Sequence, residues 1–162
     1  MTPFRILFVC MGNICRSPAA EIVCRRIMAE AGVDDRVEID SAGTIGYHAG
    51  NPPDPRMSET LTARGYEVTG RARQVRRRDL EIHDLILCAD QDNLHDVRAL
   101  DPGGATHGKI RLLTSYCREH QADHVPDPYY GGQQGFENVA DLIEDACAGL
   151  RDELSAPGGP LA

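Results

Sequence analysis

The chain has 162 residues, a length that fits one domain with a sizeable core. Hydrophobic residues make up 41% and the formal net charge is −8, which argues against disorder, nucleic-acid binding and binding to an anionic membrane surface. The six cysteines follow neither a disulfide framework nor a Cys-x2-Cys zinc pattern, and no signal peptide or membrane-spanning segment is visible. We therefore expect a cytoplasmic protein with reduced thiols, no bound metal and no membrane insertion.

The first predicted elements lie in residues 5–18, which read Arg-Ile-Leu-Phe-Val-Cys-Met-Gly-Asn-Ile-Cys-Arg-Ser-Pro. The apolar run 6–9 predicts a buried strand that stops at Cys10. The Gly-Asn pair at 12–13 favours a tight loop, because these residue types accept positive φ most readily. The Ser-Pro pair at 17–18 predicts a helix that starts with serine as its N-cap. Backbone N–H groups at such a helix start form an anion-binding loop.

Cys10 and Arg16 stand at the two ends of this loop, with five residues between them. A cysteine that faces backbone N–H groups, a helix N-terminus and a guanidinium is expected to be a thiolate at neutral pH. Arg16 presents a planar fork that matches two oxygens of a phosphate group. A nucleophile and an oxyanion clamp in one loop predict phosphoryl transfer through a phosphocysteine.

Apolar periodicity predicts the remaining elements in chain order. The expected helices span residues 17–31, 54–64, 94–100 and 136–154, and the expected further strands span 36–41, 85–88 and 110–113. Strands that alternate with helices predict an α/β fold, here a single domain whose four-stranded parallel sheet has helices on both faces and a phosphate loop after the first strand. We expect the domain to cover residues 1–155 and residues 156–162 to form a frayed tail.

The motif Val-Cys-Met-Gly-Asn-Ile-Cys-Arg-Ser-Pro at 9–18 closely resembles the phosphate loop of the low-molecular-weight protein tyrosine phosphatases. The motif Asp-Pro-Tyr-Tyr-Gly at 127–131 resembles the general-acid loop of the same family. Both occur in the family's order and separation, and nearly the whole chain to about residue 154 lines up with family members. The resemblance implies a hydrolase that needs no cofactor and no metal. It implies phosphotyrosine-containing proteins as partners and leaves open a cognate tyrosine kinase.

The resemblance gives catalytic roles to Cys10, Arg16 and Asp127. Cys10 is expected to be the nucleophile, and Asp127 is expected to protonate the leaving group and then to activate water. Arg16 is expected to hold the phosphate together with the loop amides of Met11, Gly12, Asn13, Ile14 and Cys15.

The same resemblance implies how the substrate is bound. Ser17 would hydrogen-bond the thiolate, and Asn13 would be a left-handed residue whose side chain braces the loop. Ile14 would pack on the aromatic ring of the substrate from below. Three tyrosines would form the walls of a slot for a flat ring, namely Tyr47, Tyr129 and Tyr130.

Some positions depart from the family's pattern. Many relatives have Trp where this chain has Tyr47, a departure that bears on the depth of the pocket and on peptide preference. Some relatives have His where this chain has Gly70, so the rigidity of the loop is expected to depend on Ser41 and Asp90 instead. Cys15 can be interpreted as a redox partner of Cys10 or as a residue that only fills space. The six histidines match no motif role and are interpreted as surface or structural residues. The five arginines of residues 71–78 are interpreted as a solvated face.

Four alternative functions stay open beside this interpretation. A protein-arginine phosphatase shares the loop, although its relatives tend to have Thr where this chain has Ile14. An arsenate reductase would need further redox cysteines after the third strand, whereas Cys88 lies within that strand. A non-catalytic phosphotyrosine-binding module would not need Asp127, and a flavodoxin-like FMN-binding protein would not need a nucleophilic cysteine.

Overall fold

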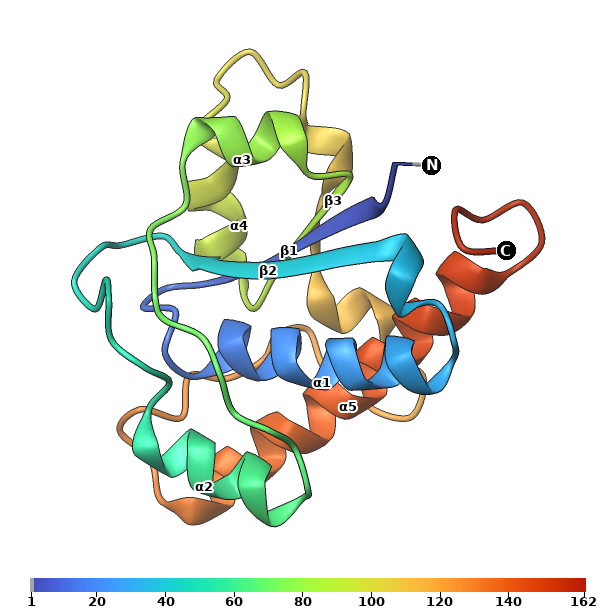
Figure 1. Ribbon diagram of the computed structural model, residues 1–162. Helices are drawn as coiled ribbons and strands as arrows, with labels where there is room; N and C mark the ends of the chain where they lie inside the picture. Colours follow the sequence, from blue (N-terminus) through green and yellow to red (C-terminus); the bar gives the residue numbers. More distant parts are fainter. Residues whose placement is uncertain (1) are drawn as a thin grey trace.

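The computed structural model describes residues 2–162 and contains a central sheet of four parallel strands (Figure 1). The strands are β1 (Phe4–Cys10), β2 (Val37–Gly43), β3 (Leu85–Cys88) and β4 (Ile110–Leu112). Their order in the sheet is β2-β1-β3-β4, so that β1 is central and pairs with strands on both sides. The predicted α/β fold with a four-stranded parallel sheet is confirmed.

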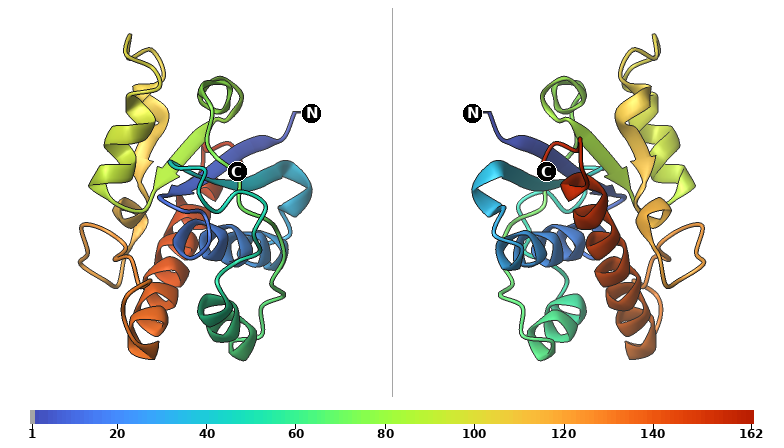
Figure 2. Two further views of the ribbon diagram at one scale, coloured as in Figure 1. Left: turned by 90° about the vertical axis from the view of Figure 1, so that its left-hand side faces the viewer. Right: turned by 90° about the vertical axis from the view of Figure 1, so that its right-hand side faces the viewer.

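Helices lie on both faces of this sheet, and residues 2–162 form five α-helices (Figures 1 and 2). They are α1 (Arg16–Glu30), α2 (Pro55–Ala63), α3 (Arg77–Ile82), α4 (Gln91–Arg98) and α5 (Gln133–Ser155). Side chains of β1 alternate between the faces, as the period of a strand requires. Ile6 and Phe8 pack with α1 and α5, whereas Leu7 and Val9 pack with the face that α3 and α4 cover. Helices on both faces are therefore also confirmed.

The first helix begins differently from the expectation. It starts at Arg16 with Cys15 as its N-cap, and no side chain caps it. Ser17 is therefore not the N-cap, and this prediction is wrong. Its hydroxyl lies instead 3.0 Å from the sulfur of Cys10 and accepts a hydrogen bond from the side chain of Asn13 at 2.7 Å. A hydroxyl engaged in these two contacts is not available for capping.

The arginine-rich stretch 71–78 is only partly a solvated face. Its last residues start α3, which the sequence analysis missed because the stretch is too polar to show an apolar stripe. Arg73 is held by two carboxylates, with Nη2 at 2.9 Å from Asp40 Oδ2 and at 2.9 Å from Asp79 Oδ1. Asp79 is only 5% exposed, so this arginine compensates a buried charge.

The C-terminal residues 156–162, for which fraying was predicted, fold back onto the core. Leu161 is 3% exposed, and its N–H donates to the carbonyl oxygen of Leu154 at 2.8 Å. Arg36 donates to the carbonyl oxygen of Ala162 at 3.1 Å. Within residues 2–162, none of the helices combines the length and the apolar composition that crossing a bilayer requires.

Asp145 on α5 fixes the turn that leads toward the 127–131 motif. Its carboxylate accepts the backbone N–H groups of Arg118 at 3.0 Å and His120 at 2.8 Å. Burial by itself would raise the pKa of Asp145, but these hydrogen bonds outweigh it and lower the pKa from 3.8 to about 2. The carboxylate therefore stabilises the fold above about pH 4, and this contribution is lost as the pH falls through about 2.

We expect Asp145→Asn to lower the free energy of unfolding by about 1–3 kcal/mol at neutral pH. The backbone N–H groups would then donate to a neutral amide oxygen in place of a charged carboxylate, and these hydrogen bonds are weaker. The difference between wild type and variant should shrink as the pH falls from 4 toward 2. Urea unfolding at several pH values measures it. A difference that does not change with pH would contradict the expectation.

Candidate active site

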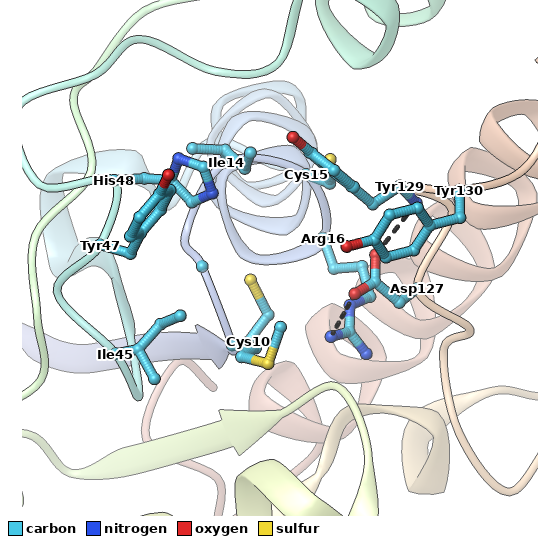
Figure 3. Close-up of a pocket in the computed structure, with 12 residues that line it drawn as sticks. Cys10, Ile14, Cys15, Arg16, Ile45, Tyr47, His48, Asp127, Tyr129 and Tyr130 are labelled. Carbon is cyan, nitrogen blue, oxygen red and sulfur yellow. Dashed lines mark hydrogen bonds and ion pairs between the residues drawn. The ribbon is translucent and has the colours of Figure 1, made fainter.

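A pocket of about 330 Å³ opens at the carboxyl end of β1 (Figure 3). Ten of the twelve residues that line it are predicted site residues: Cys10, Met11, Gly12, Ile14, Cys15, Arg16, Tyr47, Asp127, Tyr129 and Tyr130. The two other predicted residues, Asn13 and Ser17, lie behind the loop and are each 2% exposed. The fold thus brings together the 9–18 and 127–131 motifs, which are more than a hundred residues apart in sequence.

Cys10 is the last residue of β1 and is 2% exposed. Its sulfur accepts a hydrogen bond from the backbone N–H of Asn13 at 3.3 Å and shares another with Ser17 Oγ at 3.0 Å. The loop backbone and the hydroxyl of Ser17 on α1 thus both contact this one atom.

Asn13 supports the loop from inside. Its φ of 56° is left-handed, as expected, a conformation that asparagine tolerates better than most residues. Its Nδ2 donates to Ser17 Oγ at 2.7 Å and to Ser41 Oγ at 3.0 Å, and its Oδ1 accepts the N–H of Arg73 at 3.0 Å. Ser41 in turn donates to Glu21 Oε1 at 2.7 Å. These contacts join the loop to β2 and to the segment before α3.

Arg16 lies in the first turn of α1 and is 4% exposed. Its Nη1 donates to Asp90 Oδ2 at 2.5 Å and to the carbonyl oxygen of Val125 at 3.0 Å. Asp90 is itself fixed, because it caps α4 by accepting the N–H of Asn93 at 2.8 Å. Asp90 thus supports the site through the arginine, whereas Ser41 supports it through Asn13. The guanidinium is held in one orientation while its Nη2 faces the pocket.

Asp127 lies beside Arg16, across the pocket from Tyr47 and His48 (Figure 3), and its side chain is 39% exposed. Its Oδ2 is 3.7 Å from Arg16 Nη2, and its Oδ1 accepts the N–H of Tyr129 at 3.1 Å. The rings of Tyr129 and Tyr130 meet edge to face with centroids 5.0 Å apart. Tyr130 is 95% exposed and stands at the rim of the pocket.

The facing wall contains two residues that the sequence analysis missed, Ile45 and His48. His48 was interpreted as a surface or structural residue; it is half-buried and borders the pocket. Its ring lies edge-on to Tyr47 with centroids 4.8 Å apart, and 6.4 Å from the ring of Tyr129 (Figure 3). A Cβ atom on Gly12 would lie 3.0 Å from His48 Cδ2, so the glycine gives this ring room. Its position next to Tyr47 in one loop was the signal that could have identified it.

Cys15 lies under the pocket wall and is 4% exposed. Burial, and after it the charge of Asp54, raises the pKa of this thiol far above its ordinary value. Cys15 therefore remains a neutral thiol, which favours a packing role in the reduced protein. Among residues 2–162, no three His, Cys, Asp or Glu side chains form a group suited to a metal ion.

The comparisons with known proteins agree on one family. The profile described as low molecular weight phosphotyrosine protein phosphatase matches residues 5–158. A Synechocystis relative named for this family is 50% identical over 150 residues, which cover 93% of this chain and 96% of the relative. The human low molecular weight phosphotyrosine protein phosphatase is 42% identical over 143 residues, covering 88% of this chain and 90% of the human protein.

A solved structure gives the same answer. The crystal structure of a protein tyrosine phosphatase from Entamoeba histolytica with Hepes in the active site superposes with a TM-score of 0.92 at 39% identity, covering 96% of this chain and 99% of that one. The fold, the two motifs and the sequence relatives thus lead to one conclusion. The chain belongs to the low molecular weight phosphotyrosine protein phosphatase family, and it is a hydrolase.

Proposed function

We propose that this protein hydrolyses phosphotyrosine in proteins through a phosphocysteine formed on Cys10. One observation carries the proposal. The hydrogen-bonded sulfur of Cys10, the buried guanidinium of Arg16 and the carboxylate of Asp127 line a single pocket, and Arg16 Nη2 lies 3.7 Å from Asp127 Oδ2. A nucleophile, an anion clamp and a proton donor are what the cleavage of a phosphate ester needs.

In the first proposed step, the Cys10 thiolate attacks phosphorus and the bond to the phenolic oxygen breaks. Asp127 gives its proton to that oxygen, so that neutral tyrosine leaves. Arg16 and the loop N–H groups hold the equatorial phosphate oxygens, where negative charge develops. The pairing of Arg16 with Asp90 and Val125 keeps the guanidinium in place for this task.

In the second proposed step, water attacks phosphorus in the phosphocysteine. Asp127, now a carboxylate, takes a proton from the water, and the sulfur–phosphorus bond breaks. Inorganic phosphate and the Cys10 thiolate are the products. The nucleophile, the proton donor and the groups that hold the phosphate all belong to this chain in both steps. We therefore expect turnover to persist in the presence of a chelator.

The walls of the pocket support an aromatic substrate. Tyr47 and Tyr129 stand on opposite sides, and Ile14, which is 8% exposed, borders the phosphate loop between them (Figure 3). A flat phenyl ring fits such a slot, and phosphoserine is too short to pass the walls and reach Cys10. The proposed partners are phosphotyrosine-containing proteins, together with the kinase that modifies them. The six free cysteines support a reducing, cytoplasmic location.

The test compares phosphotyrosine, phosphoserine and phosphoarginine peptides side by side with a chelator present. We expect turnover of phosphotyrosine and almost none of phosphoserine. Strict metal dependence would overturn the mechanism. Preference for phosphoarginine would overturn the substrate assignment while leaving phosphocysteine chemistry intact.

We expect Ile14→Thr to raise kcat/KM for phosphoarginine and to lower it for phosphotyrosine. The apolar β-branched side chain favours the face of a phenyl ring, whereas a hydroxyl in its place can hydrogen-bond a guanidinium or orient water. One such change in a pocket alters specificity by about 1–3 kcal/mol. Ile14→Val is the matched control, since it removes one methylene and adds no hydroxyl. If Ile14→Thr and Ile14→Val change kcat/KM for phosphoarginine and phosphotyrosine by the same factors, Ile14 does not set the preference between the two substrates.

A further inference from the structure

Arg56, in the first turn of α2, contacts the loop that carries Asp127. Its guanidinium carbon lies over the ring of Tyr129, 5.2 Å from the centroid, and over the ring of Phe136, 4.8 Å from that centroid. Tyr129 follows Asp127 by two residues, and Phe136 is fully buried on α5. A cation over aromatic faces is attracted by their electron density. One side chain of α2 is thus joined to both ends of the segment between Asp127 and α5.

Asp54 fixes the other side of this guanidinium. It is 7% exposed, and its carboxylate accepts Arg56 Nε at 3.3 Å and Nη2 at 3.2 Å. Burial alone would raise the pKa of Asp54, but the hydrogen bonds from Arg56 and Met57 lower it, so the carboxylate stays charged. The N–H of Asp54 donates to the carbonyl oxygen of Ile14 at 2.8 Å. A chain of contacts therefore runs from the phosphate loop through Asp54 and Arg56 to Tyr129.

The loop of residues 126–132 has few other polar attachments. Two of its residues are prolines, which have no N–H to donate. In the described part of the chain, its hydrogen bonds stay within the loop or join it to α5, as in Tyr129 N to Asp127 Oδ1 at 3.1 Å and Gly131 N to Pro128 O at 2.9 Å. Its contacts with other elements include the ion pair of Asp127 with Arg16 at 3.7 Å, the guanidinium of Arg56 over the Tyr129 ring, and the His48 ring 6.4 Å from that of Tyr129.

We propose that Arg56 is a positioning residue for the general acid. By stacking on Tyr129 while paired with Asp54, it holds the 126–132 loop so that Asp127 faces the pocket that contains Cys10. The inference rests on the proposed role of Asp127 as the proton donor. A planar guanidinium is suited to this task, because it can pair with a carboxylate in its plane and stack on a ring with its face.

The experiment measures kcat/KM for a series of aryl phosphates whose leaving phenols differ in basicity. Protonation matters most when the leaving oxygen is a strong base. For Arg56→Gln we therefore expect a loss of about 10- to 100-fold with phenyl phosphate and a loss within about threefold with the most acidic phenol. Asp127→Asn is measured in the same series and should show a steeper dependence of the same kind.

Arg64→Gln is the matched control. Arg64, at the end of α2, also joins this helix to α5, through Glu137 at 2.6 Å and Glu144 at 2.6 Å, whereas the cation over the Tyr129 ring is Arg56. Its loss should lower the melting temperature without changing the dependence on the leaving group. Arg56→Lys is the second variant, since it keeps the charge beside Asp54 and loses the planar face. It should melt close to wild type and still lose activity most with phenyl phosphate.

A combined variant separates positioning from a general structural effect. If Arg56 acts through Asp127, Arg56→Gln in an Asp127→Asn background should cost no more than about twofold. The inference is overturned if Arg56→Gln slows all substrates equally, changes none, or costs the same in both backgrounds. If Asp127→Asn also slows all substrates equally, the acid assignment fails together with this inference. If Asp127→Asn alone shows the leaving-group dependence, only the role of Arg56 is rejected.

Discussion

Replacing Cys10 by Ser should reduce turnover of aryl phosphates by about 10⁴- to 10⁶-fold, because the covalent route loses its nucleophile. Phosphate should still bind, since the Arg16 guanidinium, which is 4% exposed, and the loop N–H groups are unchanged. Initial rates and calorimetric titration with inorganic phosphate measure the two effects. An exchange of sulfur for oxygen changes the volume of the side chain little, so the fold should be retained.

Cys117→Ser is the control for this substitution. Cys117 is half-buried, and its Sγ donates to the carbonyl oxygen of Leu142 at 3.6 Å, away from the pocket. Its replacement should leave kcat/KM unchanged. Substantial turnover by Cys10→Ser would show that the sulfur is not the nucleophile, whatever the affinity for phosphate.

Replacing Asp127 by Asn should lower turnover of phenyl phosphate by a factor on the order of 10² to 10⁴. The amide has the same shape but cannot give a proton to the leaving oxygen. The loss should shrink as the leaving phenol becomes more acidic, because a weakly basic oxygen departs without protonation. A Brønsted plot of kcat/KM against the basicity of the phenol measures the change in slope.

Asp123→Asn is the matched control, because Asp123 lies in the same stretch of chain with its side chain 93% exposed and paired with His124. Its replacement should change neither the rate nor the slope. If Asp127→Asn slows all leaving groups equally, another group is the proton donor. A non-catalytic binding module would show no turnover to lose.

Short sequence patterns were sufficient to predict the strand, the loop and the helix that carry Cys10 and Arg16. The apolar run of β1, the Gly12-Asn13 pair and Pro18 act over a few residues, and the fold follows them. Asp127 was predicted only because Asp-Pro-Tyr-Tyr-Gly at 127–131 resembles the general-acid loop of the family; an aspartate between two prolines is by itself an ordinary polar turn. The wrong N-cap at Ser17 shows the limit of such reasoning, because a hydroxyl bonds to whichever partner the tertiary structure brings near.

Contacts between distant segments account for what the sequence did not reveal. Arg73 was interpreted as part of a solvated face because runs of charged residues usually are solvated, and its partner Asp40 is thirty-three residues away in sequence. His48 and Arg56 matched no motif, and their contacts with Tyr129 join segments that are far apart in the sequence. Pairings of this kind arise from packing of the whole domain, so a periodicity or a spacing cannot predict them.

The phosphocysteine is the central claim, and rapid acid quenching during turnover tests it most directly. Wild-type enzyme mixed with excess phosphotyrosine peptide should yield, after digestion, one phosphoryl group on the peptide that contains Cys10. This phosphoryl group should be absent in Cys10→Ala, whose side chain has no nucleophilic atom. It should still form in Cys117→Ser. A phosphoryl group on any other residue, or rapid turnover without labelled Cys10, would contradict the mechanism.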